Sequence, residues 1–232
     1  MGKADGRGIG ALLRDGERSF SFEFFPPKDE DGERVLWQSI RELEPLRPTF
    51  VSVTYGAGGA TRDRTVAITR RIARETSMLP MAHLTCVGHT TDELADIVCQ
   101  LAGAGVRNVL ALRGDPPGGP GTAWELTPEG LNYASDLVAF IKATADLTVG
   151  VAAFPEGHRD AASIDDDALV LKAKHDAGSS CRGRIRASTS SGTSRPDSST
   201  ILRIEARFRI GMIPGMIGKS TPRSRARSTS LK

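Results

Sequence analysis

One carboxylate, Glu23, stands among four phenylalanines between Ser19 and Pro27. Burial among aromatic rings penalises the charged form of a carboxyl group and raises its pKa. A carboxylic acid that is still protonated near neutral pH can donate a proton to a substrate. The sequence therefore makes Glu23 a candidate general acid. The alternative is a glutamate at a strand end that turns to solvent or pairs with an arginine.

Other polar groups stand at or just past the ends of apolar segments: Thr54-Tyr55, His83, Arg113-Gly114-Asp115 and the Pro-Glu-Gly-His run 155–158. An arginine offers planar donors to a ring or a pyrophosphate. An aspartate can accept from an NH-rich heterocycle, although Arg113 and Asp115 could equally form a solvated ion pair of little energetic value.

Two further patterns can each be interpreted in two ways. The Gly-rich turn that follows Tyr55 could bring backbone amides close to a phosphate, but it matches neither the P-loop nor the dinucleotide pattern. His83 and His158 are either ligand contacts or structural hydrogen-bonding groups. No His or carboxylate stands near either one at ligand spacing, so no metal site is predicted.

The elements that must position these groups alternate along the first 178 residues. Periodicity predicts strands over 20–25, 50–55, 81–87, 108–112 and 148–154. It predicts amphipathic helices over 33–44, 62–76, 91–104, 130–144 and 163–177. This alternation predicts five parallel βα units, in a barrel or an open doubly wound sheet. Ligands bind at the carboxyl ends of such strands, so the polar groups are expected to form one site.

The composition is that of a globular protein, with 39% hydrophobic and 25% charged residues among 232. No apolar run approaches the roughly 20 residues of a membrane span, and no secretory signal is recognisable. Three cysteines without CxxC spacing indicate neither a disulfide framework nor a zinc site. We therefore expect a cytoplasmic protein without a membrane partner.

Charge divides the chain into two parts. Residues 179–232 hold twelve lysines and arginines against Asp197 and Glu205, whereas residues 1–178 carry a net charge of −7. Seventeen residues of this tail are Ser or Thr, a composition typical of disorder. Clustered arginine attracts phosphates, but the tail has no aromatic interleaving and no recognised module, so no nucleic-acid partner is expected. The predicted division is a domain over 1–178 and a Ser/Arg-rich tail over 179–232.

Six motifs in order resemble the methylenetetrahydrofolate reductase family, in its bacterial single-domain form, over about residues 18–178. They are SFEFFPP, TYGAGG with RDRT, HLTC, LRGD, YASDL and AAFPEGH. The resemblance implies a (β/α)8 TIM barrel that binds FAD at the strand carboxyl ends. It also implies reduction of 5,10-methylenetetrahydrofolate to 5-methyltetrahydrofolate for methionine synthesis, with NADH or NADPH as the hydride donor. The sequence leaves open which nicotinamide is used and whether the chain forms a homo-oligomer.

The resemblance also implies roles for single residues. Glu23 matches the acid that protonates the folate and opens its methylene bridge. Asp115 resembles the aspartate that touches both flavin and pterin, and Thr54 resembles the nicotinamide-side contact. The other positions that match FAD contacts of the family are Tyr55, Ala57, His83, Arg113, Gly114, Tyr133, Ala134, Ala152, Phe154, His158, Ala161, Asp167 and Lys174.

The likeness stops after Gly178, where family members continue into an Ile-Thr-Gln strand and the last strands of the barrel. Here Ser179 begins unrelated sequence, rich in Arg, Ser, Gly and Pro. We interpret this change as a shift of the reading frame near codon 178. Such a chain would have an incomplete barrel and would lack a folate-contacting glutamine. The alternative to the reductase function is therefore an inactive homologue that binds flavin weakly or not at all.

Overall fold

Five parallel strands form the centre of the structure. The computed structural model describes residues 8–14, 19–55, 62–116, 122–123, 125–154, 157–158 and 161–180. Within them the strands form one sheet in the order of the chain, β1-β2-β3-β4-β5. The strands are β1 (Ser21–Phe24), β2 (Phe50–Val53), β3 (Pro80–Thr85), β4 (Asn108–Leu112) and β5 (Thr148–Val151). The predicted alternation of parallel βα units is confirmed.

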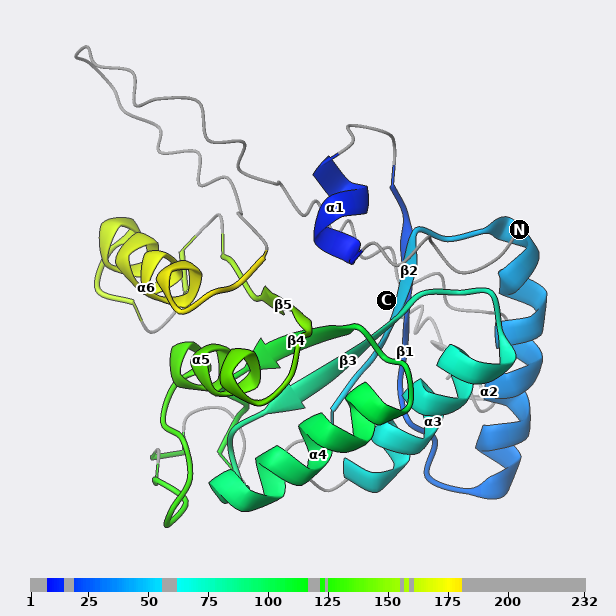
Figure 1. Cartoon of the computed structure of the whole chain (residues 1–232), viewed down its shortest axis with the longest axis horizontal. Coiled ribbons are helices and arrows are strands. Elements are labelled where there is room, and N and C mark those ends of the chain that lie inside the picture. Colours follow the sequence, from blue (N-terminus) through cyan, green and yellow to red (C-terminus); the bar gives the residue numbers. More distant parts are fainter. Residues whose placement is uncertain are drawn as a thin grey trace, which may run out of the picture.

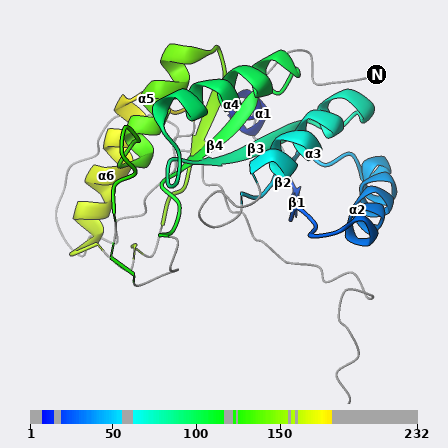
Figure 2. The ribbon, with the colours of Figure 1, turned by 90° about the horizontal axis from the view of Figure 1, so that it is seen from below.

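Helices cover the outer side of this sheet, and Figure 2 shows them following one another in an arc. They are α2 (Glu30–Leu43) with the 3-10 turn η1 (Glu44–Leu46), α3 (Arg62–Glu75), α4 (Thr91–Gly103), α5 (Ala134–Thr144) and α6 (Ile164–Asp176). Each lies where the sequence predicts a helix, with ends that coincide with the predicted ends or differ from them by up to four residues. None of the described helices is long and apolar enough to cross a membrane.

The main core lies between the sheet and these helices. Alternate strand residues such as Val53, Leu84 and Val109 are fully buried there, against helix residues such as Ile72 and Leu101. Side chains of a strand point to opposite faces in turn, so the residues between them lie on the inner face. The central strands β2 and β3 are buried on every residue, as is usual for parallel sheets.

A short helix that the sequence did not reveal, α1 (Ile9–Arg14), lies on the inner side of the sheet (Figure 1). Ile9 packs on Phe50 and Met81 near the amino ends of their strands. Its backbone N–H donates to Oδ1 of the buried Asn108 at 2.9 Å, and Nδ2 of Asn108 donates to the Pro80 carbonyl at 3.4 Å. With six residues, α1 is too short to give a recognisable periodicity. It fills the amino end of the inner face and leaves polar groups at the carboxyl end.

The fold class is confirmed as an incomplete α/β barrel of the TIM type. Among the described residues, β1 and β5 are the two ends of the sheet and do not pair with each other. After α6 the chain returns to the sheet, where the Ser180 N–H donates to the Val149 carbonyl at 2.8 Å. The predicted tail lies outside the described residues from 181 onward.

We expect Asn108→Ala to lower the free energy of unfolding by about 1–3 kcal/mol, because the buried Ile9 N–H loses its acceptor. Urea denaturation measures this change. The exposed Gln100→Ala on α4 is the control and should stay within about 0.5 kcal/mol of the parent chain. Equal midpoints for the parent and Asn108→Ala would contradict this assignment.

Candidate active site

The carboxyl edge of the sheet gathers most of the predicted site residues. Glu23 lies in β1, Thr54 directly follows β2, His83 lies in β3, Arg113 follows β4 and Ala152 follows β5. Because all five strands run in the same direction, these positions lie along one edge. This is the edge at which parallel α/β folds bind ligands.

The side chains of two predicted residues, Glu23 and His83, lie next to each other on the inner face of the sheet. Oε1 of Glu23 lies 3.5 Å from Nε2 of His83, and the two side chains are 21% and 11% exposed. Glu23 pairs in register with Ser52 of β2, which is buried between them in the order of the strands. Serine is small, so side chains from β1 and β3 can meet across β2.

Burial controls the protonation of this pair. It raises the pKa of the Glu23 carboxyl and lowers the pKa of the His83 imidazole to about 4. At neutral pH the imidazole is therefore uncharged, and the carboxyl keeps its proton to a higher pH than a free glutamate does. This combination suits proton donation by Glu23 more than a salt bridge.

The predicted rise of the Glu23 pKa is confirmed, but the phenylalanines are not its cause. Phe22 and Phe24 pack on the opposite face, against the core under α2, because residues of a strand alternate between faces. Phe25 is 64% exposed. The side chain of Glu23 is instead enclosed on the inner face, where it meets His83.

Thr85 is a candidate site residue that the sequence analysis missed. It lies two residues after His83, so strand alternation places it on the same inner face. Its Oγ1 is buried and has no hydrogen-bond partner among the described residues. Such a hydroxyl is available to a ligand. The alternation within the HLTC motif was the signal for it.

The side chain of Tyr55 lies on the helix side of the sheet. Its ring packs against the helix-side core, and its hydroxyl lies 2.9 Å from Nε2 of His89. The side chain of Tyr55 is therefore on the other face from Glu23, and its backbone is the part that lies at the site edge. Ala57 lies outside the described residues.

The turn after β4 requires its glycine. Gly114 has φ +87°, and a Cβ there would stand 2.4 Å from Cγ1 of Val87. The Arg113 carbonyl accepts from the Val87 N–H at 3.1 Å and from the Cys86 thiol at 3.3 Å. These contacts fix the turn and leave Asp115 exposed at its end.

A second polar group lies further along the edge, between β4 and α6. Nζ of Lys174 donates to the Ala152 carbonyl at 3.1 Å. Burial lowers the pKa of Lys174; the Asp167 carboxylate opposes this shift, and the positive charge of Arg113 adds to it. Arg113, which follows β4, is thus close enough to interact with Asp167 and Lys174 of α6.

The remaining predicted positions lie in the segment after β5 and at the start of α5. The rings of Phe154 and His158 meet edge to face, with centroids 4.7 Å apart. The Ala161 N–H donates to the His158 carbonyl at 2.9 Å. At the start of α5, Tyr133 is exposed and Ala134 is buried. Among the described residues, no group of three or more His, Cys, Asp and Glu side chains is arranged to hold a metal ion.

Known proteins resemble this chain over the same region. The family model described as Methylenetetrahydrofolate reductase matches residues 9–181. The 5,10-methylenetetrahydrofolate reductase of Escherichia coli (strain K12) is 47% identical over 163 residues, which cover 70% of this chain and 53% of that protein. The protein of the same name from Buchnera aphidicola subsp. Acyrthosiphon pisum (strain APS) is 39% identical over 160 residues, which cover 69% of this chain and 52% of that protein.

A plant relative, Methylenetetrahydrofolate reductase (NADH) 1 of Arabidopsis thaliana, is 37% identical over 181 residues, which cover 73% of this chain and 30% of that protein. The chain spans about half the length of the bacterial relatives it matches. On the extent of the family match and this level of identity, the chain belongs to the methylenetetrahydrofolate reductase family.

Proposed function

We propose that this chain reduces 5,10-methylenetetrahydrofolate to 5-methyltetrahydrofolate, with FAD as its cofactor and NADH or NADPH as the hydride donor. The observation that carries the proposal is the half-buried Glu23 carboxyl, 3.5 Å from an uncharged His83 at the carboxyl edge of the sheet. The names of the relatives support the same reaction. The proposal places the protein in the cytoplasm and its product in methionine synthesis.

Glu23 is the proposed acid. Reduction of the methylene group requires the bridge between the two folate nitrogens to open, and protonation of one nitrogen weakens its bond to the bridging carbon. Glu23 can supply this proton because burial keeps the carboxyl protonated above its usual range. The opened folate is a cation, and the carboxylate of Asp115 is proposed to stabilise it.

The described residues fit a flavin dinucleotide. Arg113 and Lys174 bring two interacting positive charges to one part of the edge, which suits a pyrophosphate. The unpartnered Oγ1 of Thr85 offers a hydroxyl, and Phe154 with His158 offers ring surfaces. When bound, FAD supplies the hydride transfer between the nicotinamide and the folate.

The other residues proposed to contact the cofactor are assigned from the family resemblance alone. Thr54 is proposed for the nicotinamide side, and Tyr55 is proposed to act through its backbone. The remaining positions are Ala57, His83, Gly114, Tyr133, Ala134, Ala152, Ala161 and Asp167.

The alternative is an inactive homologue whose reading frame shifts near codon 178. It is favoured by the end of the family match at residue 181 and by the coverage of only about half of the bacterial relatives. Sequencing of the gene around this codon tests the shift directly. An unbroken frame through Ser179 would remove this alternative.

Purification of the 232-residue chain distinguishes the proposed flavoenzyme from the inactive homologue. We expect a yellow protein that carries FAD, because the proposed contacts with the cofactor come from residues before 178. Flavin absorbance and extraction of the bound cofactor measure its content. A colourless protein that takes up no added FAD would favour the inactive homologue.

We expect Glu23→Gln to slow folate reduction by about 10²–10⁴-fold, because glutamine cannot donate the proton. Reduction of the flavin by NADH or NADPH should be unaffected, since that half-reaction does not use the acid. Stopped-flow absorbance follows each half-reaction separately. The measurement uses the 232-residue chain or the protein expressed from a gene repaired at codon 178. The exposed Glu42→Gln is the matched control. Equal loss of both half-reactions would show that Glu23 is structural.

The His83 pKa predicts how stability depends on pH. A group with a folded-state pKa below its ordinary value stabilises the fold above the ordinary value, and this stability is lost as pH falls. For His83 the loss runs from pH 6.5 to about 4, and it amounts to about 3 kcal/mol. We expect His83→Gln to remove this part of the slope. Urea unfolding at several pH values measures it, and parallel curves for parent and variant would contradict an uncharged His83.

A further inference from the structure

The connection from β3 into α4, residues 86–93, contacts several segments that carry proposed site residues. On one side it extends the pairing of β3 with β4. The Cys86 N–H donates to the Leu112 carbonyl at 3.2 Å, and the Val87 N–H donates to the Arg113 carbonyl at 3.1 Å. The connection therefore holds the turn that leads to Asp115.

The same connection holds the chain before α5. The Gly88 N–H donates to Oγ1 of Thr127 at 3.1 Å, and the Thr91 N–H donates to the Glu129 carbonyl at 2.9 Å. A Cβ on Gly130 would stand 2.6 Å from the His89 carbonyl oxygen. The chain that leads to Tyr133 is thus packed closely against residues 88–91.

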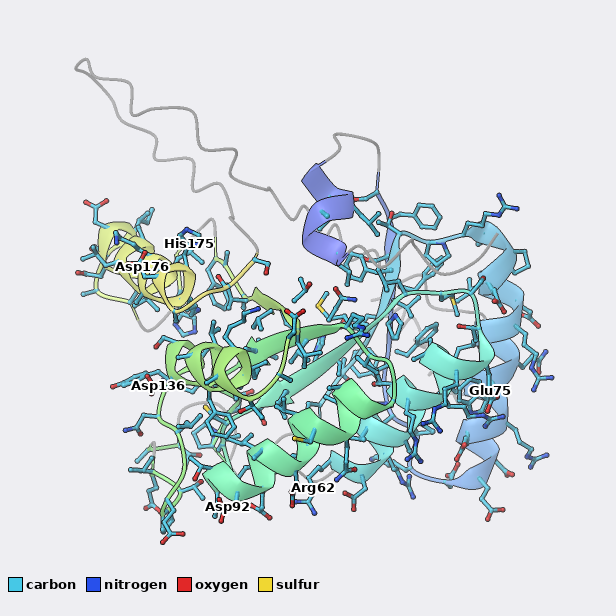
Figure 3. All side chains as sticks on the ribbon, viewed as in Figure 1. Arg62, Glu75, Asp92, Asp136, His175 and Asp176 are labelled. Carbon is cyan, nitrogen blue, oxygen red and sulfur yellow. The ribbon has the colours of Figure 1, made fainter. Side chains whose placement is uncertain are left out.

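On the other side the connection holds the end of β2 and the start of α3. Tyr55 meets His89, with hydroxyl and Nε2 at 2.9 Å and the rings edge to face. Nη1 of Arg62 lies 3.1 Å from Oε1 of Glu93, and Figure 3 shows Arg62 beside the start of α4. Tyr55 and Arg62 border residues 56–61, which lie outside the described part of the chain.

The surroundings of His89 determine which atom donates to Tyr55. His89 is 3% exposed, and its Nδ1 has no hydrogen-bond partner among the described residues. Oε2 of Glu93 stands 3.8 Å from this Nδ1, and the bond from the Thr90 N–H lowers the pKa of Glu93, so the carboxylate is charged. A negative charge there favours the proton on Nδ1. Nε2 of His89 is then the acceptor, and the Tyr55 hydroxyl is the donor.

Tyr55 is coupled to the site through Thr54. The Thr54 N–H donates to the Phe24 carbonyl at 2.9 Å, directly after Glu23, and the Thr54 carbonyl accepts from Oγ1 of Thr65 at 2.8 Å. Displacement of Tyr55 would therefore disturb the backbone beside the proposed acid.

We propose that His89 is a positioning residue for this site: by accepting the Tyr55 hydrogen bond, it holds Thr54 at the carboxyl end of β2 where ligands bind. The part that concerns ligands rests on the proposed function. His89 carries no chemistry in the reaction and acts only through Tyr55.

Amide hydrogen exchange of the full 232-residue chain, resolved by NMR, tests the proposal without any ligand. In His89→Leu, which removes the acceptor, exchange of the Thr54 amide should accelerate about tenfold. In His89→Gln, which retains an acceptor oxygen, it should return close to the parent rate. His175→Leu is the control, because Nδ1 of His175 is also buried without a partner among the described residues, but lies on α6 (Figure 3). It should leave the Thr54 rate unchanged.

Tyr55→Phe provides a second test, which also serves if His89→Leu does not fold. It removes only the hydroxyl and should accelerate Thr54 exchange to the same extent as His89→Leu. An unchanged Thr54 rate in these variants, a uniform acceleration across the whole sheet, or no rescue by glutamine would overturn the proposal.

Titration with FAD separates this proposal from the proposed function. His89→Leu should weaken FAD binding about tenfold, and glutamine should restore it. If the parent chain binds no FAD, the proposed function fails, and the exchange rates still decide the role of His89. If parent and His89→Leu bind FAD equally well, the proposed function stands and the positioning role is overturned.

Discussion

The common direction of the five strands is the constraint on which the rest of the structure depends. Each strand is followed by a helix that returns the chain to the same starting edge, so the carboxyl ends collect at the opposite edge. Residues separated by more than a hundred positions, such as Glu23 and Lys174, come to lie along one rim in this way. Burial then adjusts their chemistry, because Glu23, His83 and Lys174 all have pKa values shifted toward the uncharged form.

Side chains alternate along each strand, so the two faces of the sheet have different compositions and different roles. The helix-side face is almost wholly apolar and supplies most of the buried core. The inner face holds α1 at its amino end and polar groups at its carboxyl end. The same alternation places the side chain of Tyr55 on the helix side of the sheet and that of Glu23 on the inner side.

The fold and the location of the site could be predicted because both depend on local patterns. Apolar spacing gave the strands and helices, and parallel strands require their ends to meet. Three features could not be predicted, since they depend on contacts distant in the chain: the packing of α1 on Phe50 and Met81, the bond between Tyr55 and His89, and the partner of Glu23. The phenylalanines around Glu23 misled the prediction because neighbours in a strand face opposite ways.

Ser52 has no proposed part in the reaction, yet it pairs in register with Glu23 of β1 and with Met81 of β3, two residues before His83. Its small volume permits the carboxyl and the imidazole to approach each other. Alanine or glycine at position 52 would leave this space open, whereas a branched side chain would occupy space on the inner face beside Glu23. A small residue without proposed chemistry of its own thus leaves room for the contact on which the proposed function depends.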